Sequence, residues 1–575
     1  MGRPAMSELF THISPAWPII FGGLIAAIVP NNNVRKVLAL LAPILAGWCW
    51  YSLELGTYGV VEFGGFTLET LRYDAISRIW SLIFIIAAFL NGLYGLHEKD
   101  RVTDAAGLIY AGGALGAVFA GDLITLFMFW ELTAISSVFL IWSARNKAAT
   151  KAGLRYLAIH VLSGVLLLVG AIIHAGETGS WAFDHIGLDS PGGFLIFIAF
   201  GIKCAFPFLH NWLQDAYPKA TVVGTVILSA FTTKMAIYAL LRGFSGEESL
   251  IYIGAIMTVF PVFFAVVEND LRKVLSYSVN NQLGFMVVGI GIGSNLALNG
   301  TAAHAFADII FKGLLFMSMG AVLHRVGTTK ASELGGLFKS MPLTAFFCII
   351  GAMTISAFPL FSAFVTKSMI LAAVAEDGHW VVWIMLLFAS AGVLEHSGIK
   401  IPYFAFFGHD SGRRVREAPV NMLMAMGLAA LMCVYLGINY GKLYDLLPFQ
   451  DAIYAPYTFD HIVGQMQLLL GAIFAFALLM RIGAYPSEKR SVNLDFDWVY
   501  RRFGDSLARW VWLMLDRMSA AAGNAWDRAM RGIGGRLYQV FSPMGTLSRD
   551  IPSGMLAIWT SALLAIVLII AYFSP

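Results

Sequence analysis

Apolar residues form long runs along nearly the whole chain, from Trp17 to Phe573. The runs are continuous and do not alternate between apolar and polar positions, so they predict α-helices and not the strands of a barrel. Each run is about 17–25 residues long, which is enough to cross a hydrocarbon core of about 30 Å. About sixteen spans are expected on this criterion, at 17–31, 37–54, 75–96, 104–120, 122–143, 154–175, 192–210, 219–242, 249–268, 273–293, 299–324, 341–376 with an interruption, 379–406, 419–438, 461–480 and 553–573.

The overall composition agrees with this pattern. Of the 575 residues, 58% are hydrophobic and 13% are charged, and the mean hydropathy is +0.73. These values exclude an ordinary soluble domain and indicate an all-α polytopic membrane protein. No small-residue cleavage site follows the first apolar run, so we expect that run to be kept as a helix.

Basic residues gather in alternate loops, around 35–36, 99–101, 145–155, 272–273, 325–339 and 413–416. The loops between them, at 54–74, 176–190, 375–379 and 441–460, are acidic or nearly uncharged. Positively charged loops stay on the cytoplasmic side of a membrane. The pattern therefore predicts a multi-pass protein of the bacterial inner membrane with its N-terminus and C-terminus in the periplasm.

Two of the expected spans contain a proline. Pro207 follows Lys203 by four residues, and Pro359 precedes Lys367 in TISAFPLFSAFVTKSMIL. A proline inside a helix frees a carbonyl group, and a membrane tolerates this only where protein or water satisfies the backbone. Broken helices at matching places in two halves indicate inverted repeats with a pathway between them. We place the repeats at 104–242 and 249–406.

The remaining regions supply further helices. Residues 1–103 and 407–484 are expected to add spans at either side of the repeats, and 552–575 a final one. Between them, residues 485–551 set apolar side chains against arginines at helical spacing, which is typical of an amphipathic helix on the membrane surface, here the cytoplasmic one. A solvated cytoplasmic tail is the alternative. The residues concerned are Trp498, Phe503, Leu507, Trp510 and Leu513 on one side and Arg501, Arg502, Arg509 and Arg517 on the other.

Ionisable residues inside the expected spans are the candidate functional groups. A charged side chain at the bilayer centre costs roughly 2.5–3.5 kcal/mol, so several of them in neighbouring helices need a reason. Proton movement is the reason we favour. The residues are Glu131, His160, Lys203, Lys234, His304, Asp308, Lys312 and Lys367.

Their spacing indicates which of them can meet. His304, Asp308 and Lys312 follow one another at i, i+4 and i+8 and share one helix face, so Asp308 is expected to pair with Lys312. In the first repeat we expect Glu131 to pair with Lys203, after which Lys234 receives the proton. Burial disfavours the charged form of a lysine, whereas a nearby carboxylate favours it. A carboxylate that moves can therefore decide whether the lysine keeps its proton.

Structural interpretations are open for several of these residues. Lys234 and Lys367 are long enough to reach an interface from inside a span. A pair between Asp308 and Lys312 can serve only to fix helix register, and His160 fits a hydrogen-bonded core histidine. The combination of five charged residues with two helix breaks favours a proton path.

Other chemistry finds little support in the sequence. It has no phosphate-binding loop, dinucleotide fingerprint or cysteine cluster, so we expect neither a cofactor nor a nucleic-acid partner. Asp122 and Asp270 are weak candidates for Na⁺ ligands. Four single cysteines in apolar runs are interpreted as small core residues: Cys49, Cys204, Cys348 and Cys433.

Five segments of the chain resemble a known family. Together they are similar to the antiporter-like subunits shared by Mrp-type cation/proton antiporters, respiratory complex I and membrane-bound hydrogenases, over residues 70–410. The D-type subunit of the Mrp antiporters is the branch that the chain resembles most, and NLDFDWVYRR near the C-terminus looks like the proteobacterial type. The segments are GDLITLFMFWELTAISSVFLI, KCAFPFLHNWLQDAYPKATVVGTVILSAFTTKMAIYALLR, ENDLRKVLSYSVNNQLGFMVVGIG, HAFADIIFKGLLFM and SAFVTKSMIL.

The resemblance implies two inverted five-helix repeats and a line of proton-carrying residues. It assigns Glu131 to the glutamate of the fifth helix, and Lys203 and Lys234 to the lysines of the seventh and eighth. Lys312 and Lys367 take the places of the lysines in the eleventh and twelfth helices. His304 and Asp308 are secondary candidates.

Three departures from the family pattern stand out. Asp308 occupies a position where the family often has a histidine, so it would hold Lys312 charged more firmly. The family motif LPDAH reads Leu213-Gln214-Asp215-Ala216-Tyr217 here, and Pro207 alone remains of the prolines that follow the Lys203 position.

The expected function is that of one component of an antiporter complex, built from several subunits, that exchanges protons for Na⁺ or another monovalent cation. Its expected partners are other membrane subunits, the transported ions and the lipid bilayer, and it is not an enzyme by itself. One alternative is a proton-pumping membrane component of an oxidoreductase that resembles complex I or a hydrogenase. Another is a scaffold with a charge line that no longer functions.

Overall fold

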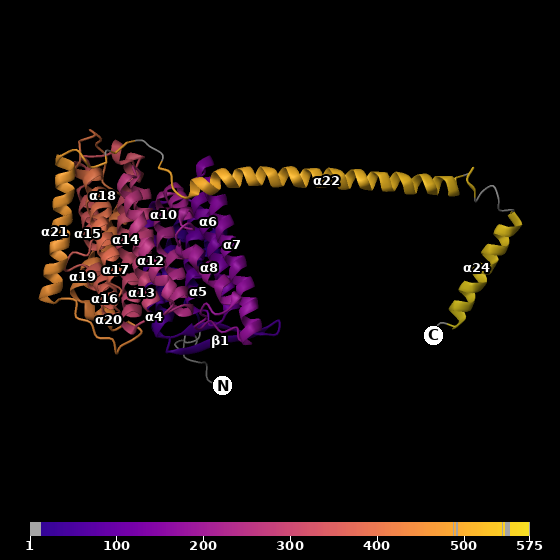
Figure 1. Ribbon diagram of the computed structural model, residues 1–575, viewed down its shortest axis with the longest axis horizontal. Helices are drawn as coiled ribbons and strands as arrows, with labels where there is room; N and C mark the ends of the chain where they lie inside the picture. Colours follow the sequence, from indigo (N-terminus) through magenta and orange to yellow (C-terminus); the bar gives the residue numbers. More distant parts are fainter. Residues whose placement is uncertain (1–12, 487, 490–492, 543, 547–552, 574–575) are drawn as a thin grey trace. The chain divides into compact units, whose positions relative to one another are not determined.

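The computed structural model describes residues 13–486, 488–489, 493–542, 544–546 and 553–573. The chain divides into two compact units, Met1–Asn493 and Leu494–Pro575. In the first unit the helices lie side by side, with α5 to α8 at one side of the bundle and α19 and α21 at the other (Figure 1). The order along the bundle follows the chain order only in part: the Tyr94 hydroxyl, from an early helix, donates to the Met317 carbonyl at 2.8 Å in the middle of the bundle.

Each expected span coincides with one helix or with several consecutive helical segments. Among the described residues, 12 helices are long and apolar enough to cross a membrane, and shorter apolar helices accompany them. The prediction of an all-α polytopic membrane protein is confirmed. The helices of the first unit are α2 (Ala16–Ile28), α3 (Asn32–Tyr51), α4 (Ala75–Tyr94), α5 (Arg101–Phe119), α6 (Leu123–Trp142), α7 (Lys147–Thr178), α8 (Pro191–Cys204), α9 (Asn211–Ala216), α10 (Val222–Ala230), α11 (Thr232–Gly243), α12 (Glu248–Val267), α13 (Leu271–Ile292), α14 (Asn295–Val326), α15 (Pro342–Ile355), α16 (Ser362–Glu376), α17 (Trp380–Val393), α18 (Lys400–Pro402), α19 (Val420–Ile438), α20 (Tyr440–Tyr444) and α21 (Phe459–Arg481).

The segment between α3 and α4 is a β-hairpin of strands β1 (Gly56–Phe63) and β2 (Phe66–Tyr73). Gly64 and Gly65 join the strands with φ values of +61° and +86°, the positive values that a tight hairpin turn of this kind requires. The hairpin docks on the start of α6, where the Gly121 N–H donates to the Glu69 carbonyl at 2.8 Å. The sequence predicted only a loop at 54–74.

The two predicted helix breaks have the same sequence pattern and the same backbone. Ala205-Phe206-Pro207-Phe208 follows α8, and Ala357-Phe358-Pro359-Leu360 follows α15. The first and last residues of each quartet have positive φ, at 62° and 69° in one and at 59° and 74° in the other. In both, the N–H of the phenylalanine before the proline donates to a carbonyl five residues earlier, at 3.0 and 3.1 Å. The matching breaks agree with a fold of two repeats.

A third break separates α10 from α11 and was not predicted. Phe231 leaves the helix with φ −110° and ψ −64°. Tyr217 Oη donates to the freed Leu228 carbonyl at 2.8 Å, and Tyr110 Oη accepts from the Thr232 N–H at 2.9 Å. Two buried tyrosines thus satisfy the backbone groups that the break releases.

The second unit contains α22 (Asp497–Phe541) and α24 (Ser553–Phe573). Trp498, Phe503 and Trp510 are exposed on α22 within this unit, and Arg501 forms an i,i+4 ion pair with Asp497. A long helix with exposed aromatic residues and arginines agrees with the predicted amphipathic segment 485–551, and its place on a membrane surface stays a prediction. Parts of the predicted regions 1–103, 485–551 and 552–575 lie outside the described residues, at 1–12, 487, 490–492, 543, 547–552 and 574–575.

Candidate functional site

Lys203 lies at the C-terminal end of α8 and is completely buried. Its Nζ donates to the Trp130 carbonyl at 2.5 Å and to Thr133 Oγ1 at 2.9 Å, both on α6. The same Nζ lies 4.4 Å from the centroid of the Trp130 ring, which adds an attraction between the cation and the aromatic face. The lysine next to the first break is therefore held by α6.

Glu131 does not form the expected ion pair with Lys203 among the described residues. Its carboxylate lies against Gly164 of α7, where even a Cβ atom would overlap it, and its buried Oε1 has no hydrogen-bond partner in the part of the chain that the structure describes. Successive residues of a helix point about 100° apart. The lysine reaches the carbonyl of Trp130, whereas the Glu131 side chain leaves α6 toward α7.

His160 on α7 is a core residue, as expected, but its hydrogen bonding differs. Its ring lies 4.1 Å from the ring of Tyr156 and 4.5 Å from that of Trp212, centroid to centroid. Neither ring nitrogen has a hydrogen-bond partner among the described residues. A buried polar group normally has a protein or water partner, so this histidine has hydrogen-bonding capacity that the described residues do not use.

Lys234 and Asp308 form an ion pair between α11 and α14. Nζ of Lys234 lies 2.8 Å from Oδ2 of Asp308, and neither side chain is exposed. The same Nζ donates to the Ser229 carbonyl at 3.2 Å, one of the groups freed where α10 ends. The third break thus places a carbonyl beside the lysine.

The expected pair of Asp308 and Lys312 is therefore replaced by a pair across two helices. Lys312 instead donates to Ser278 Oγ on α13 at 2.7 Å. Positions i and i+4 lie on one helix face, but a partner on a facing helix can be closer than a neighbour on the same helix. The spacing of residues along α14 alone could not reveal that the partner of Asp308 lies on α11.

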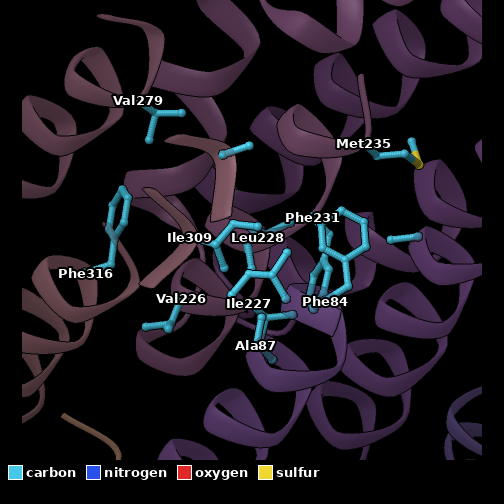
Figure 2. Close-up of a cluster of buried hydrophobic side chains, with 14 of the residues drawn as sticks. Phe84, Ala87, Val226, Ile227, Leu228, Phe231, Met235, Val279, Ile309 and Phe316 are labelled. Carbon is cyan, nitrogen blue, oxygen red and sulfur yellow. The ribbon is translucent and has the colours of Figure 1, made fainter. Parts of the chain in front are cut away.

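Apolar side chains enclose the break next to this ion pair. Figure 2 shows Ile227, Leu228 and Phe231 close to Phe84 of α4 and Ile309 of α14. All five are buried. Such surroundings strengthen an electrostatic interaction and make an unpaired charge costly.

His304 and Lys367 are held near the second break. His304 has Thr366 Oγ1 at 3.0 Å from Nδ1 and Gln282 Oε1 at 3.1 Å from Nε2. Lys367 Nζ donates to the Ile355 carbonyl at 3.3 Å and lies 4.9 Å from the centroid of the Phe285 ring. The last residue of α15 thus supplies its free carbonyl to the lysine, and neither Lys367 nor Lys234 reaches an interface: their exposed fractions are 1% and 0%.

Three ionisable residues that the sequence analysis omitted lie in the span after α16. Glu395 and His396 stand in a π-helical segment, Leu394–Ile399, and Lys400 follows it. Pro402 has no N–H to donate to the preceding turn, and π-helical turns often occur at functional sites. Three ionisable residues within 395–400 were a signal as strong as the one that identified α14.

His396 connects this span to Lys312 through two hydroxyl groups. Ser397 Oγ donates to Ser278 Oγ at 2.9 Å and lies 2.8 Å from His396 Nδ1. Ser278 in turn accepts from Lys312. His396 Nε2 is buried with no hydrogen-bond partner among the described residues. Hydroxyl groups both donate and accept, so this connection can pass a proton.

Asp122 and Asp270 act as helix caps. Asp122 accepts from the Thr125 N–H at 2.7 Å and from the Glu69 N–H at 2.7 Å, at the start of α6. Asp270 accepts from the Arg272 N–H at 2.9 Å and from Thr329 Oγ1 at 2.8 Å, at the start of α13. No group of three or more His, Cys, Asp or Glu side chains with metal-binding geometry occurs among the described residues. The four cysteines are buried and free.

The chain matches a family described as NADH:quinone oxidoreductase/Mrp antiporter, TM, over residues 120–392. The D-type subunit of the Na(+)/H(+) antiporter of Alkalihalophilus pseudofirmus is 30% identical over 427 residues, which cover 68% of this chain and 85% of the relative. The A/B-type subunit of the probable K(+)/H(+) antiporter of Rhizobium meliloti is 29% identical over 461 residues, 72% of this chain. This chain spans only 46% of the length of that second relative.

Two solved structures have a similar fold. A chain of the Mrp complex from Dietzia sp. is 21% identical with a TM-score of 0.69, and the match covers 81% of this chain and 100% of that one. A chain of the membrane-bound sulfane sulfur reductase, an archaeal respiratory membrane complex, is also 21% identical with a TM-score of 0.68, covering 96% of this chain and 99% of that one. The helical fold agrees with the match to the family over residues 120–392 and with the relative that this chain covers over 85% of its length. This chain belongs to the NADH:quinone oxidoreductase/Mrp antiporter family of membrane proteins.

Proposed function

We propose that this chain is the proton-conducting component of an antiporter complex, built from several subunits, that exchanges protons for Na⁺ or another monovalent cation. The observation that carries the proposal is the buried ion pair of Lys234 and Asp308, at 2.8 Å and with no exposure of either side chain. Ionisable groups at this depth are costly and are a mark of ion pathways in membrane proteins. The relatives named as Na(+)/H(+) and K(+)/H(+) antiporter subunits support it.

The proposed relay follows the buried residues across the bundle. Glu131 acts on Lys203 through space, and Lys203 exchanges protons with Lys234 through water and the polar groups near the first break. From Lys234 the path leads to Lys312 and then to Lys367. His304 and Asp308 are the secondary members of this relay, and Asp308 is paired with Lys234 until the two side chains separate.

We further propose that the chain works in the bacterial inner membrane together with other membrane subunits, because its relatives are named as subunits. The loops rich in lysine and arginine then face the cytoplasm. Both termini lie in the periplasm in this orientation. Protons move inward as the cation moves outward.

A second function is favoured by one specific observation. The chain of the sulfane sulfur reductase complex aligns with 96% of this chain, against 81% for the Mrp chain. The difference favours a redox-driven complex in which the electron-carrying centres lie in other subunits. In that case the same buried residues would pump protons. We call these residues, Glu131, Lys203, Lys234, Lys312 and Lys367, the buried line.

The test uses everted membrane vesicles from a strain that lacks its own antiporters and expresses this chain with its neighbouring genes. Under the antiporter proposal, added Na⁺ or K⁺ collapses a preformed pH gradient only when the neighbouring subunits are present. If no cation does so, but a reductant such as NADH builds a gradient that needs this chain, the redox-driven function is correct.

A further inference from the structure

Lys400 is a buried lysine that none of the proposed steps uses. Its Nζ donates to the carbonyls of Val266 at 2.6 Å, Glu268 at 2.7 Å and Ala265 at 3.3 Å. These carbonyls lie at and just beyond the C-terminal end of α12, where the partial negative charge of the helix favours a cation. The ammonium group therefore sits in a preformed acceptor site.

The carboxylate that pairs with Lys400 comes from the segment after α21. Glu488 Oε1 lies 2.9 Å from Lys400 Nζ, and the two side chains are 7% and 0% exposed. Tyr485 anchors this segment through its ring, which lies 5.1 Å from that of Phe476 and 6.3 Å from that of Phe404, centroid to centroid. Glu488, in the segment after α21, is thus paired with a buried lysine of the bundle.

Other titratable groups surround this pair. Glu268 forms an ion pair with Lys273 at 2.7 Å, and the Asn493 side chain also donates to it. Burial raises the pKa of Glu488, Lys400 opposes that rise, and the negative charge of Glu268 adds to it. The net result is a Glu488 pKa above its usual value, which brings the carboxyl group closer to exchange near neutral pH. Lys273 lies in the first turn of α13 and belongs to the basic residues around 272–273 that the sequence places, with the other loops rich in lysine and arginine, on one face of the protein, here called the basic face.

The pair is close to the end of the buried line. Lys400 follows His396 by about one helical turn in the same span. Lys312 reaches His396 through Ser278 and Ser397. Groups that can carry protons thus lead from Lys312 to His396, and the pair of Lys400 and Glu488 begins about one helical turn farther along that span.

We propose that Lys400 and Glu488 form the last proton-transfer pair between the buried line and the basic face of the protein, an inference that rests on the proposed function. An N–H bond of the Lys400 ammonium breaks, its electron pair stays on Nζ, and an O–H bond forms on Glu488. The products are a neutral amine and a neutral carboxylic acid. Glu488 then releases the proton to water, and Lys400 takes a new proton from the side of His396. When a proton enters from the basic face instead, the same transfers occur in the reverse order.

The test compares Glu488→Gln, Glu488→Asp and Lys400→Met in the whole complex, in everted vesicles that report cation-driven proton flux between pH 6.5 and 9. Glutamine keeps the volume of the side chain and can still accept a hydrogen bond from Lys400, but it cannot take up a proton. We expect at least a tenfold loss of flux in Glu488→Gln and Lys400→Met, with normal assembly of the complex. Glu488→Asp should restore a large part of the flux with a shifted pH profile.

Glu177→Gln is the matched control, because Glu177 is an exposed glutamate at the end of α7. It should keep the wild-type flux. If Glu488→Gln also keeps the wild-type flux and pH profile while Lys203→Met loses its flux, the inference is wrong and the proposed function stands. If the wild-type complex itself shows no cation-driven flux, the proposed function is wrong and the inference falls with it.

Discussion

Lys234 on α11 and Asp308 on α14 are joined by an ion pair of 2.8 Å in which both side chains are fully buried. The two helices belong to different halves of the proposed pair of repeats. A lysine and a carboxylate removed from water are stable only together, since removal of one leaves the other as an unpaired buried charge. The charge line therefore depends on contact between the halves.

Asp308→Asn should lower both stability and transport. The variant leaves Lys234 without its counter-ion, at a cost of about 3–5 kcal/mol when the remaining charge stays buried. We expect a lower thermal unfolding temperature in detergent and at least a tenfold lower cation-driven proton flux in vesicles. A double variant, Lys234→Met with Asp308→Leu, should recover the stability but not the flux. Wild-type flux in Asp308→Asn would contradict the relay through this pair.

Lys203 offers a test that separates its charge from its position. Thr133→Val removes the hydroxyl that accepts from Lys203 Nζ at 2.9 Å but leaves the Trp130 carbonyl in place. One lost hydrogen bond to a charged group is worth about 1.5–3 kcal/mol, so the flux should fall several-fold. Lys203→Met, which removes the charge, should abolish it in the same vesicle assay. Wild-type flux in Lys203→Met would mean that Lys203 does not carry protons.

The charge of Asp74 should make the stability of the fold depend on pH in the acidic range. It caps α4 through the Ser77 N–H at 2.8 Å and pairs with Arg242 at 2.8 Å. Burial acts to raise the pKa of Asp74, but Arg242, Ser77 and Arg72 outweigh it, so the pKa lies below its usual value of 3.8. A lowered pKa in the folded state means that the stabilisation is present above about pH 4 and is lost as the pH falls through the folded-state value.

The measurement for Asp74 is the unfolding temperature of wild type and Asp74→Asn in detergent between pH 6 and pH 3. Wild type should be the more stable protein at pH 6. The difference should shrink below pH 4, where the carboxylate of the wild type takes up its proton. A difference that stays constant over the whole range would show that the charge of Asp74 does not stabilise the fold.

The sequence predicted those features that depend on local pattern. Continuous apolar runs marked the spans because helices are the structures that satisfy their own backbone in lipid. Pro207 and Pro359 marked two breaks, since a proline removes a hydrogen-bond donor wherever it stands. The third break at Phe231 has no proline or glycine next to it. It depends on the hydroxyl groups of Tyr110 and Tyr217, which come from other helices.

The pairing of charges was the part that spacing could not supply. Four residues along one helix made Lys312 the expected partner of Asp308, but the partner is Lys234 on another helix. Glu131 and Lys203 were expected to pair, yet the lysine reaches a carbonyl and a hydroxyl group instead. Which groups meet is decided by how the helices pack. Lys400, by contrast, was visible in the sequence as a charge within an apolar run.

Tyr110→Phe tests whether the third break positions Lys234. The Tyr110 hydroxyl accepts from the Thr232 N–H at 2.9 Å and lies 2.6 Å from Thr232 Oγ1, at the first residue of α11. Phenylalanine leaves that N–H buried without a partner, at a cost of about 1–3 kcal/mol. The freed end of α11 can recover the loss if α10 and α11 join into one regular helix. That movement would withdraw the Ser229 carbonyl from Lys234.

We therefore expect Tyr110→Phe to lower the proton flux several-fold, although the residue carries no proton itself. Tyr94→Phe is the matched control, because Tyr94 is an equally buried tyrosine whose hydroxyl donates to the Met317 carbonyl inside α14, at 2.8 Å, and not to a group of the break. It should lose a similar amount of stability and keep its flux. If both variants lose stability and flux in the same proportion, the break only supports the fold, and Lys234 does not depend on its geometry.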